Sequence, residues 1–372
     1  MKRLLTIAAT ALVLAAPAHA GAPPVQARAY FVVNAATGEV IASRDAHARV
    51  PIASITKLMT VLVALERVKL SDVVTVNRSV AAVGESTINL RVGERITVRD
   101  LVEAALIQSA NDAADALAEY VGHGDAGRFV ALMNAKASAL GLDDTHFARP
   151  DGLDAPGHVS SARDVTRLAE IAMHNAVIRE VVRKRSDTIS GNRLLHTWND
   201  LLGSFPGLIG VKTGHTGGAG WCQVAAARGR GTTIYATILG SPTRSQRNVD
   251  LAALLRWGLS RYRVARVITT GRTYALVQTG YGRAGLPLVS LRAVLRSVRI
   301  GRPLVSRVVA AGAVALPVRA GQRLGTLRVY DGRRLVGERP LVAEHAVRRP
   351  GLGARVGFYA RRTVKHVWGL FT

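Results

Sequence analysis

The sequence predicts an α/β chain of the α+β type, in which an antiparallel sheet flanked by helices is followed by a small β-rich domain. Three observations lead to this fold class. Strand-like patterns near the N-terminus return after residue 207, and amphipathic helical patterns lie between them. Beyond about Ala265, short Val, Leu and Arg segments with frequent Gly and Pro replace the helical patterns. A length of 372 residues allows two domains, and 48% hydrophobic residues are enough to form cores.

The N-terminus has the pattern of a secretory signal peptide over residues 1–20. Two basic residues precede an apolar run over residues 4–16, and Ala18-His19-Ala20 suits a cleavage site. We expect cleavage after Ala20 and export of the protein. An uncleaved anchor helix is the alternative, but the apolar run is short for a membrane span.

The remaining sequence offers few signals for disulfides, metals or membrane spans. No later apolar run approaches 18 residues, so we expect no internal transmembrane helix. The single cysteine, Cys222, cannot form a disulfide within the chain and is interpreted as a small buried apolar residue. The ten histidines show no paired metal-ligand spacing, so we predict no metal and no other cofactor.

Basic residues concentrate in the last part of the chain. Residues 261–372 hold 22 Lys and Arg against three acids, a net charge of +19, whereas residues 1–260 hold 28 against 22, a net charge of +6. This asymmetry favours an anionic partner for the C-terminal part. Nucleic acid does not suit an exported protein, which leaves anionic lipid or a cell-envelope polymer. A genome biased towards Arg and Ala is the competing explanation.

The larger domain begins with strands and continues with helices. Two short strands surround an Ala-Thr-Gly-Glu turn at residues 36–39. A helix that is apolar nearly all round begins near Ser54. A further helix begins near Thr97, with Asp100 as its capping partner, and a polar island at residues 109–112 interrupts its periodicity.

The second half of this domain continues with helices before strands return. A helix within residues 125–142 ends at Gly141, and Ser161 caps the next one. Strands are expected at 208–216 and within 220–240, where a hairpin turns at 228–231, and a last helix is expected over 248–262.

Three short motifs combine hydroxyl, amide and amine groups. They are Ser54-Ile-Thr-Lys57, Ser109-Ala-Asn111 and Lys212-Thr-Gly214. Ser54 and Lys57 share one helix face, and a serine hydroxyl needs a base to act as a nucleophile. Lys57 can be that base if its pKa falls from about 10.4 towards 7. Burial and repulsion from Lys212 would both lower the pKa; a surface lysine is the alternative.

These motifs, in this order, are those of penicillin-recognising serine enzymes. The chain resembles the D-alanyl-D-alanine carboxypeptidases, the low-molecular-mass penicillin-binding proteins. Longer segments share the likeness, among them IASITKLMT, LIQSANDAADALAEYVG, LMNAKASALGLDDTHFARPDGLDAPGHVSSARDV and GVKTGHTGGAGWC. The likeness is strong over residues 28–262 and implies a β-lactamase/transpeptidase-like domain. Ala110 stands where many relatives have glycine, and the segment 183–210 is shorter than in many relatives.

The resemblance implies a role for each motif. Ser54 is the nucleophile and Lys57 its base. Ser109 relays a proton to the departing D-alanine, and Asn111 holds Lys57 and the substrate backbone. The backbone N–H groups of Ser54 and His215 form the oxyanion hole, so the imidazole of His215 has no required role. Capping residues at a helix end are the alternative for Ser109 and Asn111.

The third motif suits a substrate that ends in a carboxylate. Lys212 and Thr213 offer a cation and a hydroxyl along an edge strand. Gly214 removes a side chain where the substrate would lie beside the strand as an extra strand. Arg247 is the candidate for a second carboxylate-binding position, although Arg244 lies close in the sequence.

The leading functional hypothesis is a serine-type D-Ala-D-Ala carboxypeptidase that trims peptidoglycan stem pentapeptides through an acyl-enzyme on Ser54. β-Lactams mimic the dipeptide and are expected to acylate the same serine. A DD-endopeptidase that cleaves crosslinks is the alternative. A rapidly deacylating β-lactamase is disfavoured because residues 146–164 contain no glutamate. The intact motifs argue against a non-catalytic envelope-binding protein.

The C-terminal segment 355–372 has the pattern of an amphipathic helix. Its predicted apolar face holds Val356, Ala360, Val364, Val367, Trp368 and Phe371, and its basic face holds Arg361, Arg362, Lys365 and His366. Such a helix suits the interface of an anionic membrane; packing on its own domain is the alternative. We expect a periplasmic protein, peripheral on the outer face of the inner membrane. The predicted division is a signal at 1–20, a catalytic domain at 21–262, a basic β-rich domain at 263–354 and the helix at 355–372.

Overall fold

The computed structural model describes residues 21–368. The predicted signal peptide and Phe371 lie outside this range. The described residues divide into two compact units, of which the first ends at Arg261 and the second begins at Tyr262. Among the described residues, no helix is both long enough and apolar enough to span a membrane.

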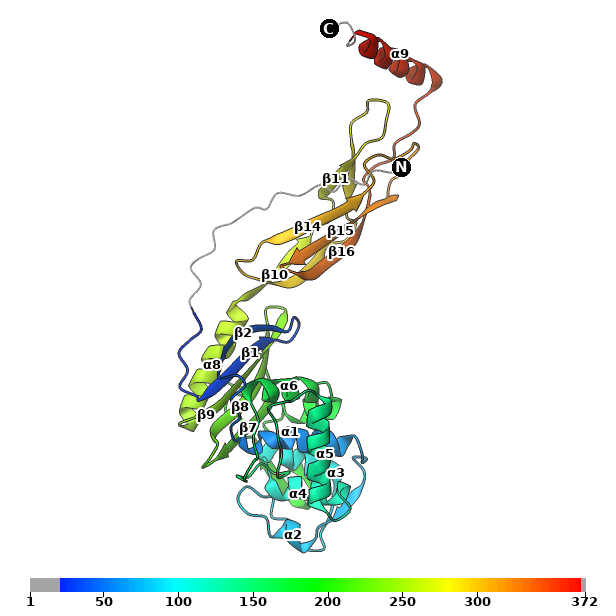
Figure 1. Ribbon diagram of the computed structural model, residues 1–372. Helices are drawn as coiled ribbons and strands as arrows, with labels where there is room; N and C mark the ends of the chain where they lie inside the picture. Colours follow the sequence, from blue (N-terminus) through cyan, green and yellow to red (C-terminus); the bar gives the residue numbers. More distant parts are fainter. Residues whose placement is uncertain (1–20, 369–372) are drawn as a thin grey trace. The chain divides into compact units, whose positions relative to one another are not determined.

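An antiparallel five-stranded sheet forms the centre of the first unit, as the sequence predicts. Its strands, in spatial order, are β2 (Glu39–Arg44), β1 (Ala29–Asn34), β9 (Thr232–Ser241), β8 (Gly220–Gly229) and β7 (Leu208–Thr216). Figure 1 shows α8 (Arg244–Ser260) along one side of the sheet and α6 (Ala162–Ala172), with the other helices, on the opposite side. β7 is therefore an edge strand with the helical region beside it.

Helices fill the rest of this unit. The remaining helical elements are η1 (Ala53–Thr56), α1 (Lys57–Leu65), α2 (Arg78–Ala81), α3 (Val98–Glu103), η2 (Ala104–Gln108), α4 (Asn111–Val121), α5 (Ala126–Ala139), α7 (Ala176–Val181) and η3 (Ser190–Asn192). All of α1 except its last residue is buried, which explains its nearly uniform apolar sequence. The side chains of Thr97 and Ser161 accept hydrogen bonds from backbone N–H groups at the starts of α3 and α6, as predicted.

Two short strand pairs and α7 were not predicted from the sequence. The pairs are β3 (Val73–Thr75) with β4 (Arg95–Thr97), and β5 (Ser186–Ile189) with β6 (Arg193–His196). Segments of three or four residues are too short to show a periodic pattern. Both pairs lie beside the helical region rather than in the central sheet.

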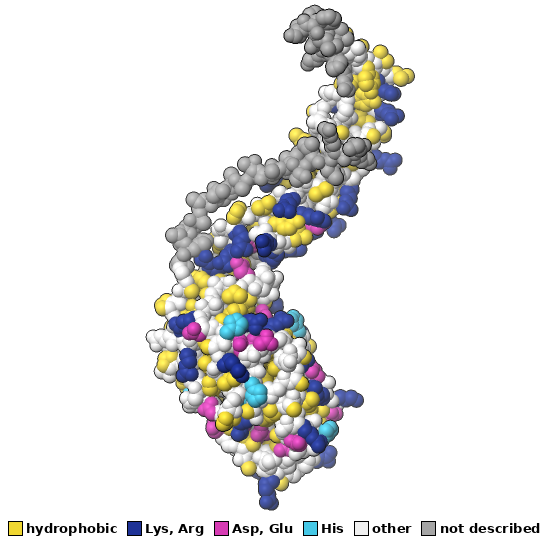
Figure 2. All heavy atoms as spheres, in the orientation of Figure 1, with side chains coloured by type: hydrophobic (Ala, Val, Ile, Leu, Met, Phe, Trp, Pro, Cys, Tyr) yellow, Lys and Arg dark blue, Asp and Glu magenta, His cyan; other side chains and the backbone are white. Residues whose placement is uncertain are grey.

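The second unit is β-rich, as predicted. A five-stranded sheet has the order β11 (Thr273–Val277), β12 (Leu286–Val289), β16 (Arg334–Ala343), β15 (Arg323–Asp331) and β14 (Leu304–Ala310), and β10 (Tyr262–Ile268) pairs with β13 (Val294–Arg299). Ile268, Leu288 and Leu327 are among its fully buried core residues. The helix α9 (Leu352–Trp368) follows. Figure 2 shows many Lys and Arg side chains and few acids on the visible face of this unit.

Candidate active site

The predicted nucleophile lies on a tight turn immediately before α1. Ala53 has a φ of +50°, and η1 leads from it into the helix, so Ser54 stands on η1 rather than on α1 itself. The expected pairing of side chains is present, because Lys57 Nζ donates a hydrogen bond to Ser54 Oγ at 2.9 Å. Ser54 is half-buried, whereas Lys57 has no exposed surface. In this pair the hydroxyl is therefore accessible from solvent, whereas the amine is enclosed by protein.

Lys57 is held by oxygen atoms from separate parts of the chain. Its Nζ donates to Asn111 Oδ1 at 2.7 Å and to the Asp151 carbonyl oxygen at 2.5 Å, in addition to Ser54. Burial lowers the pKa of Lys57 to about 8, although four carboxylates oppose the shift. These carboxylates belong to Asp151, Asp115, Asp112 and Glu85. A neutral amine is thus accessible near neutral pH, as a base for Ser54 requires.

The expected repulsion between the two lysines acts on Lys212. Burial, and then the positive charges of Lys57 and Arg247, lower the pKa of Lys212 well below its usual value. At Lys57 burial is the largest cause of the fall in the pKa. The predicted burial of Lys57 is confirmed, and the repulsion between the two amines, which is mutual, appears in the pKa of Lys212.

The second motif is placed by a break between two helices. η2 is a π-helix that ends at Gln108; the residue after it, Ser109, has left-handed φ and ψ of 68° and 30°, and α4 begins at Asn111. The break turns both side chains into the site. Asn111 Oδ1 accepts from Lys57, and Asn111 Nδ2 donates to the Gly84 carbonyl at 3.1 Å. Lys212 Nζ donates to Ser109 Oγ at 2.8 Å, so the second and third motifs are in direct contact.

Gly214 has a packing role beside the predicted one. A Cβ atom at this position would lie 2.8 Å from the Ile52 carbonyl oxygen and 3.0 Å from the Ser54 nitrogen. The space on the Cβ side of Gly214 is therefore filled by the nucleophile turn, and Gly214 also lines the pocket at Ser54. This close packing fixes η1 against β7, and with it the position of Ser54.

A pocket of about 220 Å³ opens at the nucleophile. It is lined by Ser54, Glu85, Ser86, Ser109, Trp198, Thr213, Gly214, His215, Trp221 and Arg247. Lys57, Asn111 and Lys212 are buried; Lys57 contacts Ser54, Lys212 contacts Ser109, and Asn111 contacts Lys57. Every predicted site residue therefore lines the pocket or belongs to the hydrogen-bond network directly behind it.

Arg247, and not Arg244, is the arginine that lines the pocket. Arg247 is 1% exposed, lies 5.6 Å from the Trp221 ring, and donates to Asp200 Oδ2 at 3.2 Å. Burial lowers the pKa of Arg247 to about 10, so it remains a cation at neutral pH. Arg244 also pairs with Asp200, but it lies over the ring of Trp198 and does not line the pocket.

The tryptophans at the pocket were not predicted as site residues. The imidazole of His215 stacks on the Trp221 ring, with centroids 4.0 Å apart. Trp198 donates through Nε1 to the Gln108 carbonyl at 2.9 Å. No pattern in the sequence marked either side chain as part of the pocket, because neither belongs to one of the three motifs.

Comparison with known proteins agrees with this geometry. A family model described as D-alanyl-D-alanine carboxypeptidase matches residues 16–243. The chain belongs to this family. The D-alanyl-D-alanine carboxypeptidase DacC of Escherichia coli (strain K12) is 32% identical over 366 residues, which cover 90% of this chain and 88% of that protein.

Two solved structures extend the comparison to the fold. The DD-transpeptidase of Streptomyces K15 is 31% identical, with a TM-score of 0.62, and the match covers 65% of this chain and 100% of that one. The carboxypeptidase DacD of Francisella tularensis is 24% identical, with a TM-score of 0.65, and the match covers 92% and 98%. These matches confirm the predicted transpeptidase-like fold, and membership of the family makes the protein a serine peptidase.

A buried histidine supports the nucleophile turn of this family member. Ala148 N donates to His158 Nδ1 at 3.0 Å, so the proton of the neutral ring is on Nε2. Nε2 lies 2.8 Å from Thr56 Oγ1, which donates to the Ala53 carbonyl at 2.8 Å. Burial lowers the pKa of His158 to about 4, so the ring stays neutral. His158 was not predicted, since 102 residues separate it from Thr56.

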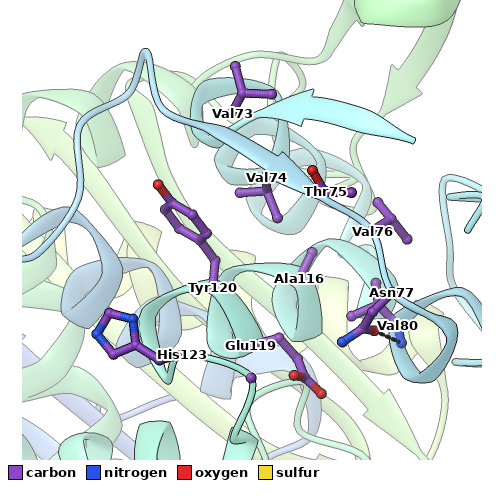
Figure 3. A pocket seen from close by; sticks show the side chains of 11 residues that line it. Val73, Val74, Thr75, Val76, Asn77, Val80, Ala116, Glu119, Tyr120 and His123 are labelled. Carbon is purple, nitrogen blue, oxygen red and sulfur yellow. Dashed lines mark hydrogen bonds between the residues drawn. The ribbon is translucent and has the colours of Figure 1, made fainter. Parts of the chain in front are cut away.

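A second hollow lies away from the carboxypeptidase motifs. Figure 3 shows this pocket between β3, α2 and α4, with Val74, Ala116 and Tyr120 among the side chains that line it. It shares no lining residue with the pocket at Ser54. Among the described residues, no group of three His, Cys, Asp or Glu side chains could hold a metal ion.

Proposed function

We propose that this protein is a serine-type D-Ala-D-Ala carboxypeptidase that removes the terminal D-alanine from peptidoglycan stem pentapeptides. The observation that carries the proposal is the hydrogen bond of 2.9 Å between Ser54 Oγ and Lys57 Nζ, an amine whose pKa burial lowers to about 8. Membership of the family supports the reaction class.

Acylation begins when neutral Lys57 takes the proton of Ser54 Oγ. The oxygen then attacks the carbonyl carbon of the penultimate D-alanine, and the backbone N–H groups of Ser54 and His215 stabilise the oxyanion. Ser109 Oγ passes a proton to the departing amine and is reprotonated by the proton that Lys57 gained, which returns Lys57 to its neutral form. Because Lys212 Nζ donates to Ser109 Oγ at 2.8 Å, it lowers the cost of negative charge on that oxygen. Water later hydrolyses the acyl-enzyme.

The terminal carboxylate of the substrate is bound by the basic side of the pocket. Arg247 and Thr213 line the pocket, and buried Lys212 is adjacent to Thr213. A bound carboxylate would raise the pKa of Lys212 again and restore its positive charge. A free D-alanine carboxylate fits this arrangement.

Mass spectrometry after treatment with benzylpenicillin tests the nucleophile. An adduct is expected on Ser54 and is expected to be absent from the Ser54→Ala variant. An adduct on another residue, or none at all, would contradict the acyl-enzyme.

Product analysis tests the substrate. We expect release of D-alanine from pentapeptide muropeptides and much slower cleavage of crosslinked dimers. Faster cleavage of the dimers would instead establish the alternative, a DD-endopeptidase.

We also propose that the protein is exported and attaches to the outer face of the inner membrane through α9. The signal-like N-terminus supports export. On α9, Phe358 packs near Tyr281 with ring centroids 5.7 Å apart, whereas Val356 and Val364 are 66% and 62% exposed. The exposed apolar side chains favour an interfacial helix on an anionic membrane.

Two measurements test this location. Intact-mass analysis of the exported protein is expected to give Gly21 as the first residue. Deletion of residues 355–372 is expected to release the protein from membranes without loss of hydrolysis. Unchanged membrane fractionation of the truncated protein would contradict the anchor.

A further inference from the structure

The pocket at Ser54 contains a single acidic side chain among its described lining residues, that of Glu85. The backbone on both sides of Glu85 is fixed to the second motif. Asn111 N donates to the Ser86 carbonyl at 2.6 Å, and Asn111 Nδ2 donates to the Gly84 carbonyl at 3.1 Å. Ser86 Oγ adds a hydrogen bond of 3.1 Å to the Gln108 carbonyl. Glu85 therefore projects from an anchored loop.

The carboxylate of Glu85 has no partner within the described part of the chain. It is exposed and makes neither an ion pair nor a side-chain hydrogen bond there. Its backbone φ is +63°, a conformation that suits Gly or Asn better than Glu. Within the described residues the carboxylate thus stabilises no part of the fold through a hydrogen bond or ion pair, and it is available to bind a ligand in the pocket.

Opposite charges occupy different parts of the pocket. Glu85 directly follows Gly84, whose carbonyl accepts from Asn111, and Asn111 Oδ1 accepts from Lys57, so Glu85 lies on the Lys57 side of the pocket. The charges that act on Lys212 are those of Lys57 and Arg247. The carboxylate of the leaving D-alanine is attracted to Lys212 and Arg247 and repelled by Glu85. A substrate that matches both charges has its terminal carboxylate on the basic side. It also carries a cation near Glu85, on the part of the peptide that becomes attached to Ser54.

We infer that Glu85 binds a side-chain ammonium group on the residue that precedes D-Ala-D-Ala in the substrate. This inference rests on the proposed carboxypeptidase activity and names a substrate class for it: stem peptides with a free amine at position three. The pair is solvent-exposed, so its effect on kcat/KM is about twofold to fivefold and decreases with added salt.

Two tripeptides test the inference. Nα-acetyl-L-Lys-D-Ala-D-Ala has a free side-chain amine, and Nα,Nε-diacetyl-L-Lys-D-Ala-D-Ala lacks it. We expect wild-type kcat/KM to be about fivefold higher for the free amine. The Glu85→Gln variant is expected to lose this preference, so that its kcat/KM values for the two peptides become equal.

Matched controls separate the inference from the proposed function. Asp143→Asn removes one exposed acid outside the pocket and is expected to keep the preference. Acylation by benzylpenicillin, which carries no ammonium group, is expected to respond to Glu85→Gln only through the lost effect of Glu85 on the pKa of Lys57, a change that both peptides share. Equal hydrolysis of both peptides by wild type, or a preserved preference in Glu85→Gln, overturns the inference alone. Hydrolysis of neither peptide by wild type overturns the carboxypeptidase proposal with it.

Discussion

The two buried lysines of the active site have almost the same burial and opposite electrostatic surroundings. Lys57 on α1 donates to three oxygen atoms and lies near four carboxylates, which limit the fall of its pKa to about 8. Lys212 on β7 donates to two oxygens, and its charged neighbours are the cations Lys57 and Arg247. Neighbouring charge alone would make Lys212 the more readily neutral amine, so it is the hydrogen bond to Ser54 that marks Lys57 as the base. Lys212 regains its charge when a carboxylate binds beside it.

Replacement of the base is expected to have the largest effect. Lys57→Arg keeps the positive charge but removes any group that can lose a proton near neutral pH. Acylation by benzylpenicillin is expected to slow by about 10³-fold or more, measured as the rate of adduct formation on Ser54. Lys136→Arg, on the surface helix α5, is the matched control. Acylation by Lys57→Arg within tenfold of wild type would exclude Lys57 as the base.

Replacement of the anion receptor is expected to have a smaller and substrate-dependent effect. Lys212→Gln removes the cation beside Thr213, and kcat/KM for a peptide ending in D-Ala-D-Ala is expected to fall by about 30- to 100-fold. The loss is expected to be much smaller for the same peptide ending in a carboxamide. Equal losses for the two peptides would show that Lys212 acts through Ser109 instead.

Local features of this site could be predicted from the sequence. The helix caps at Thr97 and Ser161, the strand at 208–216 and the three motifs all depend on patterns within a few residues. The identity of the base followed from its spacing to the serine and from the apolar residues around it.

Features that depend on distant parts of the chain could not be predicted. The packing of Gly214 against the Ser54 turn joins residues about 160 positions apart in the sequence, and no periodicity reports such a contact. The distribution of carboxylates around Lys57 likewise requires coordinates. The sequence therefore identified Lys57 and Lys212 as interacting cations, but not the carboxylates that surround Lys57.

Substitution of His158 tests how much its hydrogen bonds stabilise the turn that carries Ser54. His158→Phe removes the hydrogen bonds to Ala148 N and Thr56 Oγ1, and we expect a loss of about 1–3 kcal/mol in unfolding free energy and about tenfold slower acylation. His158→Gln keeps groups that can donate and accept hydrogen bonds. It is expected to retain most of the unfolding free energy and most of the acylation rate of the wild type. Urea unfolding and penicillin acylation measure the two effects. Unchanged acylation in His158→Phe would show that the turn needs no such support.

The same histidine predicts a pH dependence of stability. The ring is neutral in the folded protein down to about pH 4, whereas in the unfolded chain it gains a proton below about pH 6.5. Stability is therefore complete above pH 6.5 and decreases as the pH falls towards 4, by about 3 kcal/mol over that window. His158→Gln is expected to reduce this decrease. An identical pH dependence in the variant would assign the loss to other groups.

The smallest expected effect concerns the carboxylates that distinguish the two lysines. Burial, and then the charge of Asp151, raise the pKa of Asp115 to about 7, so Asp115 is largely ionised where Lys57 titrates and raises its pKa. Asp115→Asn removes that charge. The midpoint of the acidic limb of the pH–rate profile for acylation is then expected to shift to lower pH by about half a pH unit. The control Asp143→Asn is expected to leave the limb in place. A limb that stays fixed or moves upward in Asp115→Asn would mean that burial alone sets the pKa of Lys57, and that the carboxylates do not account for the contrast with Lys212.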